Sequence, residues 1–453
     1  MLKKHQPISK ATLLTIALSL LGLGLLTISP GAQAVPSFSR QTGAACSMCH
    51  VSAFGPDLTP YGRDFKLNGY TSGENSKLPP VSAMVMGSFT NTKKNQDPAD
   101  LPPGNGFNAN NNFTFDQASL FYAGRIWDQV GAFSQLTFDG VENRLALDNT
   151  DVRFSDQATL AGQDLVYGIS ANNLPTVQDL WNTTPVWGFP FNSSPIAPAP
   201  SAAALIDGGL GATQVGGATL YSMINRLLYV EAGAYTTFAK NFQQAMGAWA
   251  PDQNVIDGGA PYWRVALQHN WDGQYVEIGH YGFRANVFPG GDRSFGTDRY
   301  TDLAVDATYQ YLGDMTHIFE LRSTYIRENQ ELFATHAAGG SPFSNNQLNT
   351  FKINAAYTFQ QTYGLTFAYN RITGTKNTGI YNTDAGFAMS GKPDSEFFTV
   401  DLSYVPFGKN YSMLDSLMNL HIGLTYIGYN KFNGTSFHAG DNNTFLLNGW
   451  LAF

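Results

Sequence analysis

From Val81 to the end of the chain, apolar and polar side chains alternate with a period of two in segments of roughly ten residues. Alternate residues of a β-strand lie on opposite faces, so each segment predicts a strand with one apolar and one polar face. Such strands are typical of a barrel wall between lipid and an aqueous lumen. The strands of a soluble sandwich also alternate, but they are usually shorter and have fewer aromatic ends. The segment 302–311 is an example, with one apolar face made of Leu303, Val305, Ala307, Tyr309 and Tyr311.

These segments predict about sixteen antiparallel strands, and a count of about 14 or about 18 stays open because element boundaries are uncertain by a few residues. Connections after odd-numbered strands are mostly long and those after even-numbered strands mostly short, as in outer-membrane barrels with long outer loops and short periplasmic turns. An even count places both ends of the barrel on the periplasmic side. The strands are expected to begin near residues 81, 113, 127, 143, 158, 213, 226, 262, 274, 300, 315, 350, 363, 395, 417 and 443.

Two further features belong to the predicted barrel. The stretch 172–211 is rich in Pro, Asn, Ser and Ala and has no period, so it is expected to be the largest outer loop, with the length to fold over the mouth. The last strand ends at the aromatic Phe453, and its free edge is expected to close the barrel by pairing with the first strand.

Composition narrows the class of protein further. Charged residues are 13% of the 453-residue chain, hydrophobic residues 43% and aromatic residues 13%, whereas soluble domains usually contain roughly 25% charged residues. A chain so rich in apolar side chains is not disordered. Its net charge of −8 disfavours nucleic acid as a partner and mildly favours cations. The mean hydropathy of −0.18 argues against a helical membrane protein. Together with the alternating strands, this composition predicts that outer-membrane lipid surrounds the barrel.

Residues 1–34 have the pattern of a secretory signal peptide. Lys3 and Lys4 precede an apolar stretch over 11–28, and Ala32-Gln33-Ala34 offers small residues for cleavage. The alternative is a membrane anchor, which the short apolar run and the following Ser-Pro-Gly disfavour. The chain is therefore expected to be exported and to have three parts, namely a signal peptide at 1–34, a small segment at 35–80 and the barrel at 81–453.

The two cysteines of the chain lie in one motif, Cys46-Ser47-Met48-Cys49-His50. Cys-x-x-Cys-His is the attachment signature of a c-type haem. Two thiols at this spacing can bond one porphyrin, and the adjacent imidazole can then take an axial position on its iron. A redox dithiol or a plain disulfide is the alternative, but no βαβ context for a thioredoxin-like site is visible. A zinc site would need further ligands nearby. The sequence thus predicts one covalent haem c on Cys46 and Cys49, with His50 as an axial ligand.

The second axial ligand is less defined. The segment 35–80 is very short for a free-standing cytochrome, so it is expected to lean on the barrel. Met48 lies within the motif and cannot easily reach the other face, which makes Met84 or Met86 the nearest later thioether. Their i, i+2 spacing puts both on one side of a strand, where ordinary apolar packing is the alternative explanation. The remaining candidates require the haem to sit against the barrel: His269, His280, His317, His336, His421 and His438.

Three cations flank the motif in a chain that is poor in cations: Arg40, Arg63 and Lys66. Haem propionates favour cationic hydrogen-bond donors, so these side chains are candidates for holding them. Contact with acidic lumen residues or with solvent is the alternative.

The stretch from Val35 to Tyr70 resembles the N-terminal block of the fused monohaem cytochrome–porin family, the outer-membrane iron oxidases of iron-oxidising bacteria. This dense match covers 36 residues, whereas the remainder matches only in architecture, and Ser39 stands where a small residue, usually Ala, is expected. The matching pieces are Pro36, Phe38, Arg40-Gln41-Thr42-Gly43, the haem motif, Pro56, Leu58-Thr59-Pro60, Gly62-Arg63, Phe65-Lys66-Leu67 and Gly69-Tyr70.

The resemblance implies a one-electron oxidoreductase that takes electrons from Fe(II) at the outer surface. It also implies an acceptor, a periplasmic c-type cytochrome or similar carrier. Combined with the barrel, it predicts a haem segment inserted as a plug from the periplasmic side. A haem at the periplasmic rim could not bridge an apolar band about 25 Å tall, so either the haem sits well up the pore or the donor enters it. The alternatives are a porin-type channel whose haem segment is a structural plug or sensor, and a soluble periplasmic β-protein with an attached haem.

Overall fold

The computed structural model describes residues 36–73, 79–102, 106–381, 390–409 and 418–453. The expected signal peptide at 1–34 lies outside these described residues. The strands are β1 (Val81–Thr92), β2 (Asn112–Trp127), β3 (Val130–Asp139), β4 (Arg144–Leu160), β5 (Gln163–Asn172), β6 (Val215–Ile224), β7 (Leu228–Thr237), β8 (Val255–Ile256), β9 (Ala260–Trp271), β10 (Gln274–Phe288), β11 (Asp298–Tyr311), β12 (His317–Glu331), β13 (Asn345–Phe359), β14 (Tyr363–Gly374), β15 (Ser395–Tyr404), β16 (Asn419–Lys431) and β17 (Thr444–Ala452).

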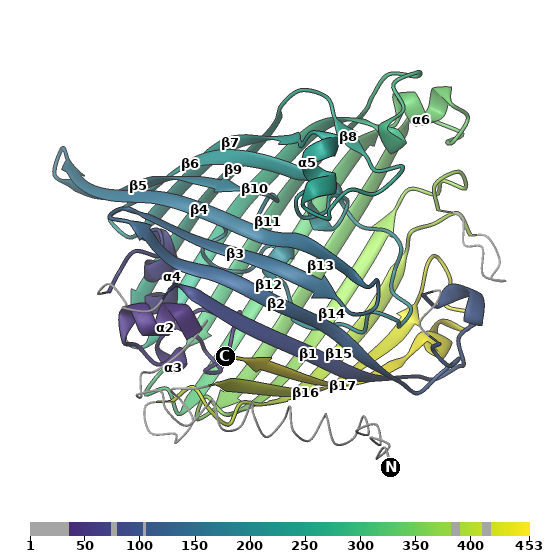
Figure 1. Ribbon diagram of the computed structural model, residues 1–453. Coiled ribbons are helices and arrows are strands. Elements are labelled where there is room, and N and C mark those ends of the chain that lie inside the picture. The colour runs from purple at the N-terminus through teal and green to yellow at the C-terminus, as the bar shows by residue number, and fades with distance from the viewer. Residues whose placement is uncertain (1–35, 74–78, 103–105, 382–389, 410–417) are drawn as a thin grey trace, which may run out of the picture.

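The strands form one antiparallel sheet that closes on itself (Figure 1). Neighbours in the sheet are neighbours in sequence, except that β7 pairs directly with β9 and the two-residue β8 pairs only with the end of β10. Closure comes from β1 and β17, which pair from Met84 opposite Ala452 to Thr92 opposite Thr444. The predicted 16-stranded barrel, closed by pairing of the first and last strands, is therefore confirmed over the described residues.

The predicted strand starts agree closely with the observed ones. The largest differences are at β5, expected near 158 and beginning at Gln163, and at β13, expected near 350 and beginning at Asn345. Sequence reasoning missed β8, which lies within a stretch expected to be an outer loop. The short turns have the geometry of tight hairpins. Ala161-Gly162 and Asp272-Gly273 both have positive φ at their two central positions, as the twist of two-residue hairpins requires.

The wall is apolar outside and polar inside, the reverse of a soluble protein. In β11, Leu303 and Val305 are 40% and 51% exposed, whereas Asp302 and Asp306 are 0% and 2% exposed. Outward apolar faces that are repeated around a closed barrel need lipid, and closure leaves no unpaired sheet edge. The barrel is therefore of the porin-like outer-membrane type. The end with the short turns, where the chain also ends, is the periplasmic end.

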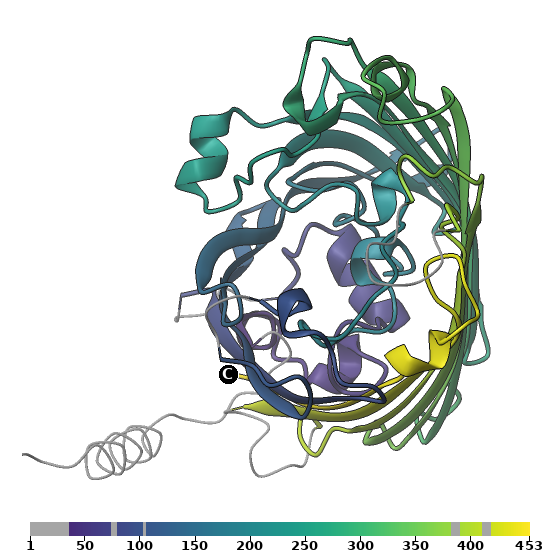
Figure 2. The same ribbon diagram turned by 90° about the vertical axis from the view of Figure 1, so that its right-hand side faces the viewer.

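The segment before β1 folds as three short helices, α2 (Pro36–Thr42), α3 (Cys46–Cys49) and α4 (Pro60–Leu67). Thr59 caps α4 by accepting a hydrogen bond from the backbone N–H of Gly62, and Pro60 occupies the first turn, where its missing N–H costs nothing. Figure 2 shows the three helices inside the ring of strands, and Figure 1 places them at the periplasmic end.

Buried contacts attach these helices to the inner wall. The Tyr70 hydroxyl donates to Asp151 of β4 at 2.7 Å, and the Asn419 amide of β16 donates to the Ala53 carbonyl at 2.6 Å. Arg322 of β12 forms an ion pair with Asp57 at 2.5 Å. The contacts reach strands on several sides of the barrel, so the N-terminal segment fills one end of the lumen.

The long connection between β5 and β6, residues 173–214, also enters the barrel, and we call it the lumen loop. Leu180 and Trp181 are 1% exposed, and the Trp181 indole N–H donates to Gln268 of β9 at 3.2 Å. Further along, the backbone N–H of Leu205 donates to Glu328 of β12 at 2.6 Å. The stretch that was expected to be the largest outer loop thus packs into the lumen.

The other short helices lie in connections between strands, and none of the described helices has the length and apolar character to cross a bilayer. They are η1 (Pro98–Asp100), η2 (Pro185–Trp187), η3 (Leu205–Asp207), α5 (Lys240–Ala245), η4 (Pro289–Gly291), α6 (Phe333–Ala337) and η5 (Ala439–Asn442).

Candidate functional site

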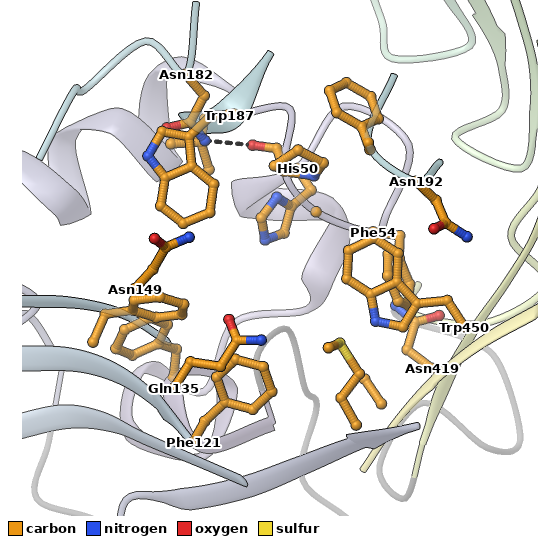
Figure 3. A pocket seen from close by; sticks show the side chains of 18 of the residues that line it. His50, Phe54, Phe121, Gln135, Asn149, Asn182, Trp187, Asn192, Asn419 and Trp450 are labelled. Atoms are coloured by element: carbon orange, nitrogen blue, oxygen red, sulfur yellow. Dashed lines mark hydrogen bonds between the residues drawn. The ribbon is translucent and has the colours of Figure 1, made fainter. Parts of the chain in front are cut away.

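A cavity of about 590 Å³ lies between the N-terminal helices, the inner faces of β1–β4 and the 185–195 stretch of the lumen loop (Figure 3). Its volume is within the range of sites for cofactors and drug-sized ligands, roughly 300–1,000 Å³. Cys46, Cys49 and His50 all line it. The two cysteines and the histidine of the motif therefore face this cavity.

His50 follows α3 directly, and its ring is held by its neighbours. The backbone N–H of His50 donates to the Cys46 carbonyl at 2.9 Å, and Nδ1 lies 3.3 Å from the Asp57 carbonyl oxygen. With Nδ1–H donating to that carbonyl, Nε2 keeps its lone pair for another partner. Figure 3 shows the imidazole directed into the cavity. Burial lowers the pKa of His50 to about 4, so the ring is neutral at neutral pH, as a metal ligand must be.

The cysteines are buried at the cavity wall, Cys46 at 0% and Cys49 at 8% exposure. A Cβ placed on Gly62 of α4 would lie 2.3 Å from the Cys49 carbonyl oxygen, so α4 approaches α3 more closely than any side chain at this position allows. Burial raises the pKa of Cys49 to about 12. Reactive redox cysteines have a lowered pKa, so the surroundings of Cys49 do not favour a dithiol redox site.

Met84 and Met86 line the same cavity from β1. They alternate with outward residues, and they are only 3% and 6% exposed. Around them lies an apolar and aromatic cluster: Phe121, Ala123, Phe38, Phe133 and Trp450. The fold thus places both candidate thioethers at the cavity that His50 enters.

Of the three cations proposed to hold propionates, the structure places only Lys66 at the cavity. Its ammonium donates to the Val177 carbonyl at 3.0 Å and to Asn182 Oδ1 at 3.3 Å, and it lies 4.9 Å from the centre of the Trp187 ring. Burial lowers the pKa of Lys66 to about 7. Asn182 in turn donates to the Pro56 carbonyl at 2.7 Å, so this group of contacts joins α4 to the lumen loop.

Arg40 and Arg63 lie away from the cavity lining. The Arg63 guanidinium donates to the Leu58 carbonyl at 2.7 Å and to Gln310 at 3.0 Å, and it stacks 3.7 Å from the centre of the Tyr275 ring. Arg40 donates to the Val81 carbonyl. Both arginines therefore connect the N-terminal segment to the barrel wall, through backbone carbonyls, an amide and an aromatic ring and not through the acidic lumen residues that were the alternative.

The candidate histidines of the barrel also lie outside the cavity lining. His421 comes nearest, with its ring centre 5.6 Å from that of Phe54 and 6.3 Å from that of Trp450, both of which line the cavity. The other five contact wall or loop groups: His269 with Trp271, His280 with Trp263, His317 with Tyr357, His336 with the Ser341 carbonyl and His438 with Asp441.

Sequence reasoning missed several residues that line the cavity. Trp187 and Phe191 come from the lumen loop, and Phe121 is an inward residue of β2. A signal for the strand residues exists in the sequence, because 83–86 and 120–123 are apolar on both faces where a water-filled lumen would require alternation. Polar residues line another part of the cavity: Asp116, Gln117, Gln135, Asp139, Asp148, Asn149, Asn192 and Ser193.

The residues present fit a covalently attached haem. Two thiols stand one helical turn apart at the wall, a neutral imidazole points inward, and thioethers and aromatic rings supply an apolar surround. The volume of the cavity is adequate, and the lysine at its edge suits an anionic substituent.

No family model matches the chain, and no curated protein matches it. Among solved structures, Salmonella typhi OmpF, in a complex with daunomycin, is 12% identical over 82% of this chain and 97% of its own, with a TM-score of 0.48. The outer membrane channel DcaP of Acinetobacter baumannii is 10% identical over 84% and 100%, with a TM-score of 0.45. An anion-selective porin from Comamonas acidovorans is 11% identical over 82% and 98%, with a TM-score of 0.45. On its own strand count, closure and inverted burial, the chain is a porin-like barrel of the bacterial outer membrane.

Proposed function

We propose that this barrel is an outer-membrane electron-transfer protein that carries one covalent haem c in the cavity beside Cys46 and Cys49. It accepts electrons from an extracellular donor, Fe(II), and passes them to a periplasmic carrier such as a c-type cytochrome. The observation that carries the proposal is the single cavity lined by Cys46, Cys49, His50, Met84 and Met86 inside the barrel. The choice of Fe(II) rests on the resemblance of residues 35–70 to the fused cytochrome–porin family.

A haem bound there would supply a reversible one-electron couple. The chain's own residues hold and surround it. Cys46 and Cys49 would tether it, and His50 would offer Nε2 while the Asp57 carbonyl orients the ring. Met84 or Met86, which line the cavity from β1, would offer a thioether as a second ligand. In net terms, Fe(II) loses one electron to become Fe(III), and one carrier is reduced by one electron.

The polar part of the cavity provides the approach for the donor. Asp116, Asp139 and Asp148 line it, and Oδ2 of Asp116 has no hydrogen-bond partner among the described residues. Carboxylates that line a cavity raise the local concentration of cations. A small hydrated cation is therefore attracted toward the same space that the cysteine motif lines.

A second candidate is a porin-type channel in which the N-terminal segment is a structural plug or sensor. The porin-like architecture favours it, as does the way buried contacts such as Tyr70 to Asp151 attach the plug to the wall. The two functions differ in one respect that can be measured, namely whether electrons from Fe(II) enter the protein.

The test is anaerobic stopped-flow spectroscopy on the full chain matured with a c-type haem and held in lipid nanodiscs. Mass analysis and a pyridine haemochrome assay first establish one porphyrin per chain, and a C46A/C49A variant serves as the control without attachment. Reduction of the visible haem bands by Fe(II) supports electron transfer. A native spectrum that dithionite reduces and Fe(II) leaves unchanged across pH would reject Fe(II) as donor and favour the channel.

A further inference from the structure

The side of the N-terminal segment that faces away from the cavity carries exposed apolar side chains. Met48 is 45% exposed and Tyr61 is 44% exposed, and the neighbouring Asp64 is also exposed. We call these three residues the periplasmic patch. Exposed apolar residues on the strands face lipid, but the patch belongs to helices inside the end of the barrel, where lipid does not cover it (Figure 2).

Only the thickness of the short helices separates the patch from the cavity. Cys46 and Cys49 of α3 line the cavity, whereas Met48 is exposed on the other side of the same turn. In α4, Phe65 lines the cavity and Tyr61, one turn earlier, is exposed. The rate of electron transfer falls steeply with the length of the path through protein, so this surface offers a short route from the cavity to the periplasm.

Hydrogen bonds hold the patch in a defined position. Thr59 Oγ1 donates to the Met48 carbonyl at 2.5 Å, which joins the two helices. Gln361, in the β13–β14 turn, donates to the carbonyls of Ser47 and His50 at 2.9 and 3.0 Å. A surface fixed in this way pays little ordering entropy when a partner binds.

The charges at this end of the barrel favour a basic partner. Besides Asp64 in the patch, exposed carboxylates stand on three of the described short turns, at Asp128, Asp272 and Asp314. Two basic side chains, Arg226 and Lys409, oppose them on the turns, and the whole chain carries a net charge of −8. Redox partners typically form small encounter complexes that electrostatics steer and an apolar centre orients.

We propose that the periplasmic patch docks a soluble electron carrier with a basic contact surface, so that electrons leave the barrel through the wall formed by α3. This inference rests on the proposed electron-transfer function. It assigns Met48 and Tyr61 to apolar contact and Asp64 to electrostatic attraction.

The test is the oxidation of the dithionite-reduced full-length holoprotein in nanodiscs, followed by stopped flow. The acceptors are a basic mitochondrial-type cytochrome c and the same protein with its lysines fully acetylated, which makes it acidic. The wild type is expected to react about tenfold faster with the basic form at low salt, and added salt is expected to reduce the difference. An equal rate with both acceptors overturns the proposal.

Variants locate the docking surface. Y61S is expected to lower the second-order rate constant with the basic carrier about tenfold, and D64K is expected to lower it similarly while raising the rate with the acetylated form. The matched control is D257K, because Asp257 is an exposed carboxylate in the β8–β9 connection, at the opposite end of β9 from the short turn with Asp272. Wild-type rates in the patch variants would overturn the proposal.

Two readouts separate this inference from the proposed function. Haem content, the absorption spectrum and the rate of reduction by Fe(II) are expected to be unchanged in the patch variants. If Fe(II) fails to reduce the wild type, the donor assignment fails, whereas docking is still measured on the dithionite-reduced protein.

Discussion

At the scale of single residues, the site depends on close approach and on one hydrogen bond. The Asp57 carbonyl accepts from both the backbone N–H of Val51, at 3.0 Å, and the His50 ring. That geometry orients the imidazole before any ligand binds. Gly62 allows α4 to lie against the Cys49 carbonyl, so the helix that follows the motif closes the cavity behind it.

Replacing Gly62 with alanine tests the role of this approach. The new Cβ would lie 2.3 Å from a backbone oxygen, which cannot rotate away. We expect the plug to be destabilised by about 1–3 kcal/mol and haem incorporation to fall. The measurements are the number of haems per chain and the temperature at which the plug unfolds. The control is G259A, because a Cβ on Gly259 meets no heavy atom within 4 Å. Equal haem content in both variants would contradict the close-packing argument.

At the scale of elements, strand alternation sets what each face of the wall contacts. Val305 and Asp306 are neighbours in β11, yet the first is 51% exposed to the outside and the second is 2% exposed inside. The position of the lumen loop is determined by the polar inner face of the wall. Its backbone donors reach inward acids such as Glu328, which accepts from the Leu205 N–H, and this explains why a loop expected outside folds inside.

Val305→Arg tests the lipid-facing assignment. A cation at the middle of the apolar band costs about 2–4 kcal/mol, so the denaturant midpoint of refolding into lipid vesicles is expected to fall. D314R places the same side chain in an exposed turn and is expected to have little effect. An unchanged midpoint for the strand variant would mean that this face does not contact lipid.

Lys66→Met tests the connection between α4 and the lumen loop. The substitution removes two donated hydrogen bonds, to Val177 and Asn182, from a buried ammonium. Because hydrogen bonds to charged groups contribute about 1.5–3 kcal/mol each, we expect faster proteolytic cleavage within residues 173–214. K93M, at an exposed lysine, serves as the control. Identical cleavage rates would show that Lys66 does not hold the loop.

At the scale of the whole molecule, two segments of the chain occupy part of the barrel lumen. The plug enters at the periplasmic end, and the lumen loop enters between β5 and β6. Buried ion pairs join them to the wall, namely Arg322 with Asp57 of the plug at 2.5 Å and Arg264 with Asp179 of the lumen loop at 3.6 Å. Buried pairs of this kind fix position more reliably than they add stability.

Arg153→Met tests whether a buried cation of the wall holds the plug in the lumen, because Arg153 donates to the Lys66 carbonyl at 3.2 Å. The change leaves Asp151 buried beside Tyr70 without its cation, at a cost of about 3–5 kcal/mol. We expect more frequent open events and higher mean conductance in planar bilayers than for the wild type. R226M, at an exposed turn, is the control. If both variants conduct like the wild type, the plug is held by other contacts.

The sequence by itself determined the local features of this protein. Strand positions, the hairpin turns and the inverted burial of the wall follow from a period of two and from turn residues, both of which act over a few positions. The Cys46–His50 motif is equally local, and so are the helix cap at Thr59 and the pairing of Met84 and Met86 on one face of β1.

Only the tertiary structure decided what these elements enclose. Met84 and Met86 share a cavity with His50, whereas Arg63 contacts Gln310, 247 positions away in sequence. Both results depend on how the plug packs inside the closed barrel. Lumen contacts join residues far apart in sequence, and many inward polar groups compete for each buried partner. A local sequence pattern does not determine which of these polar groups form contacts, because the contacts depend on barrel closure and on packing in the lumen.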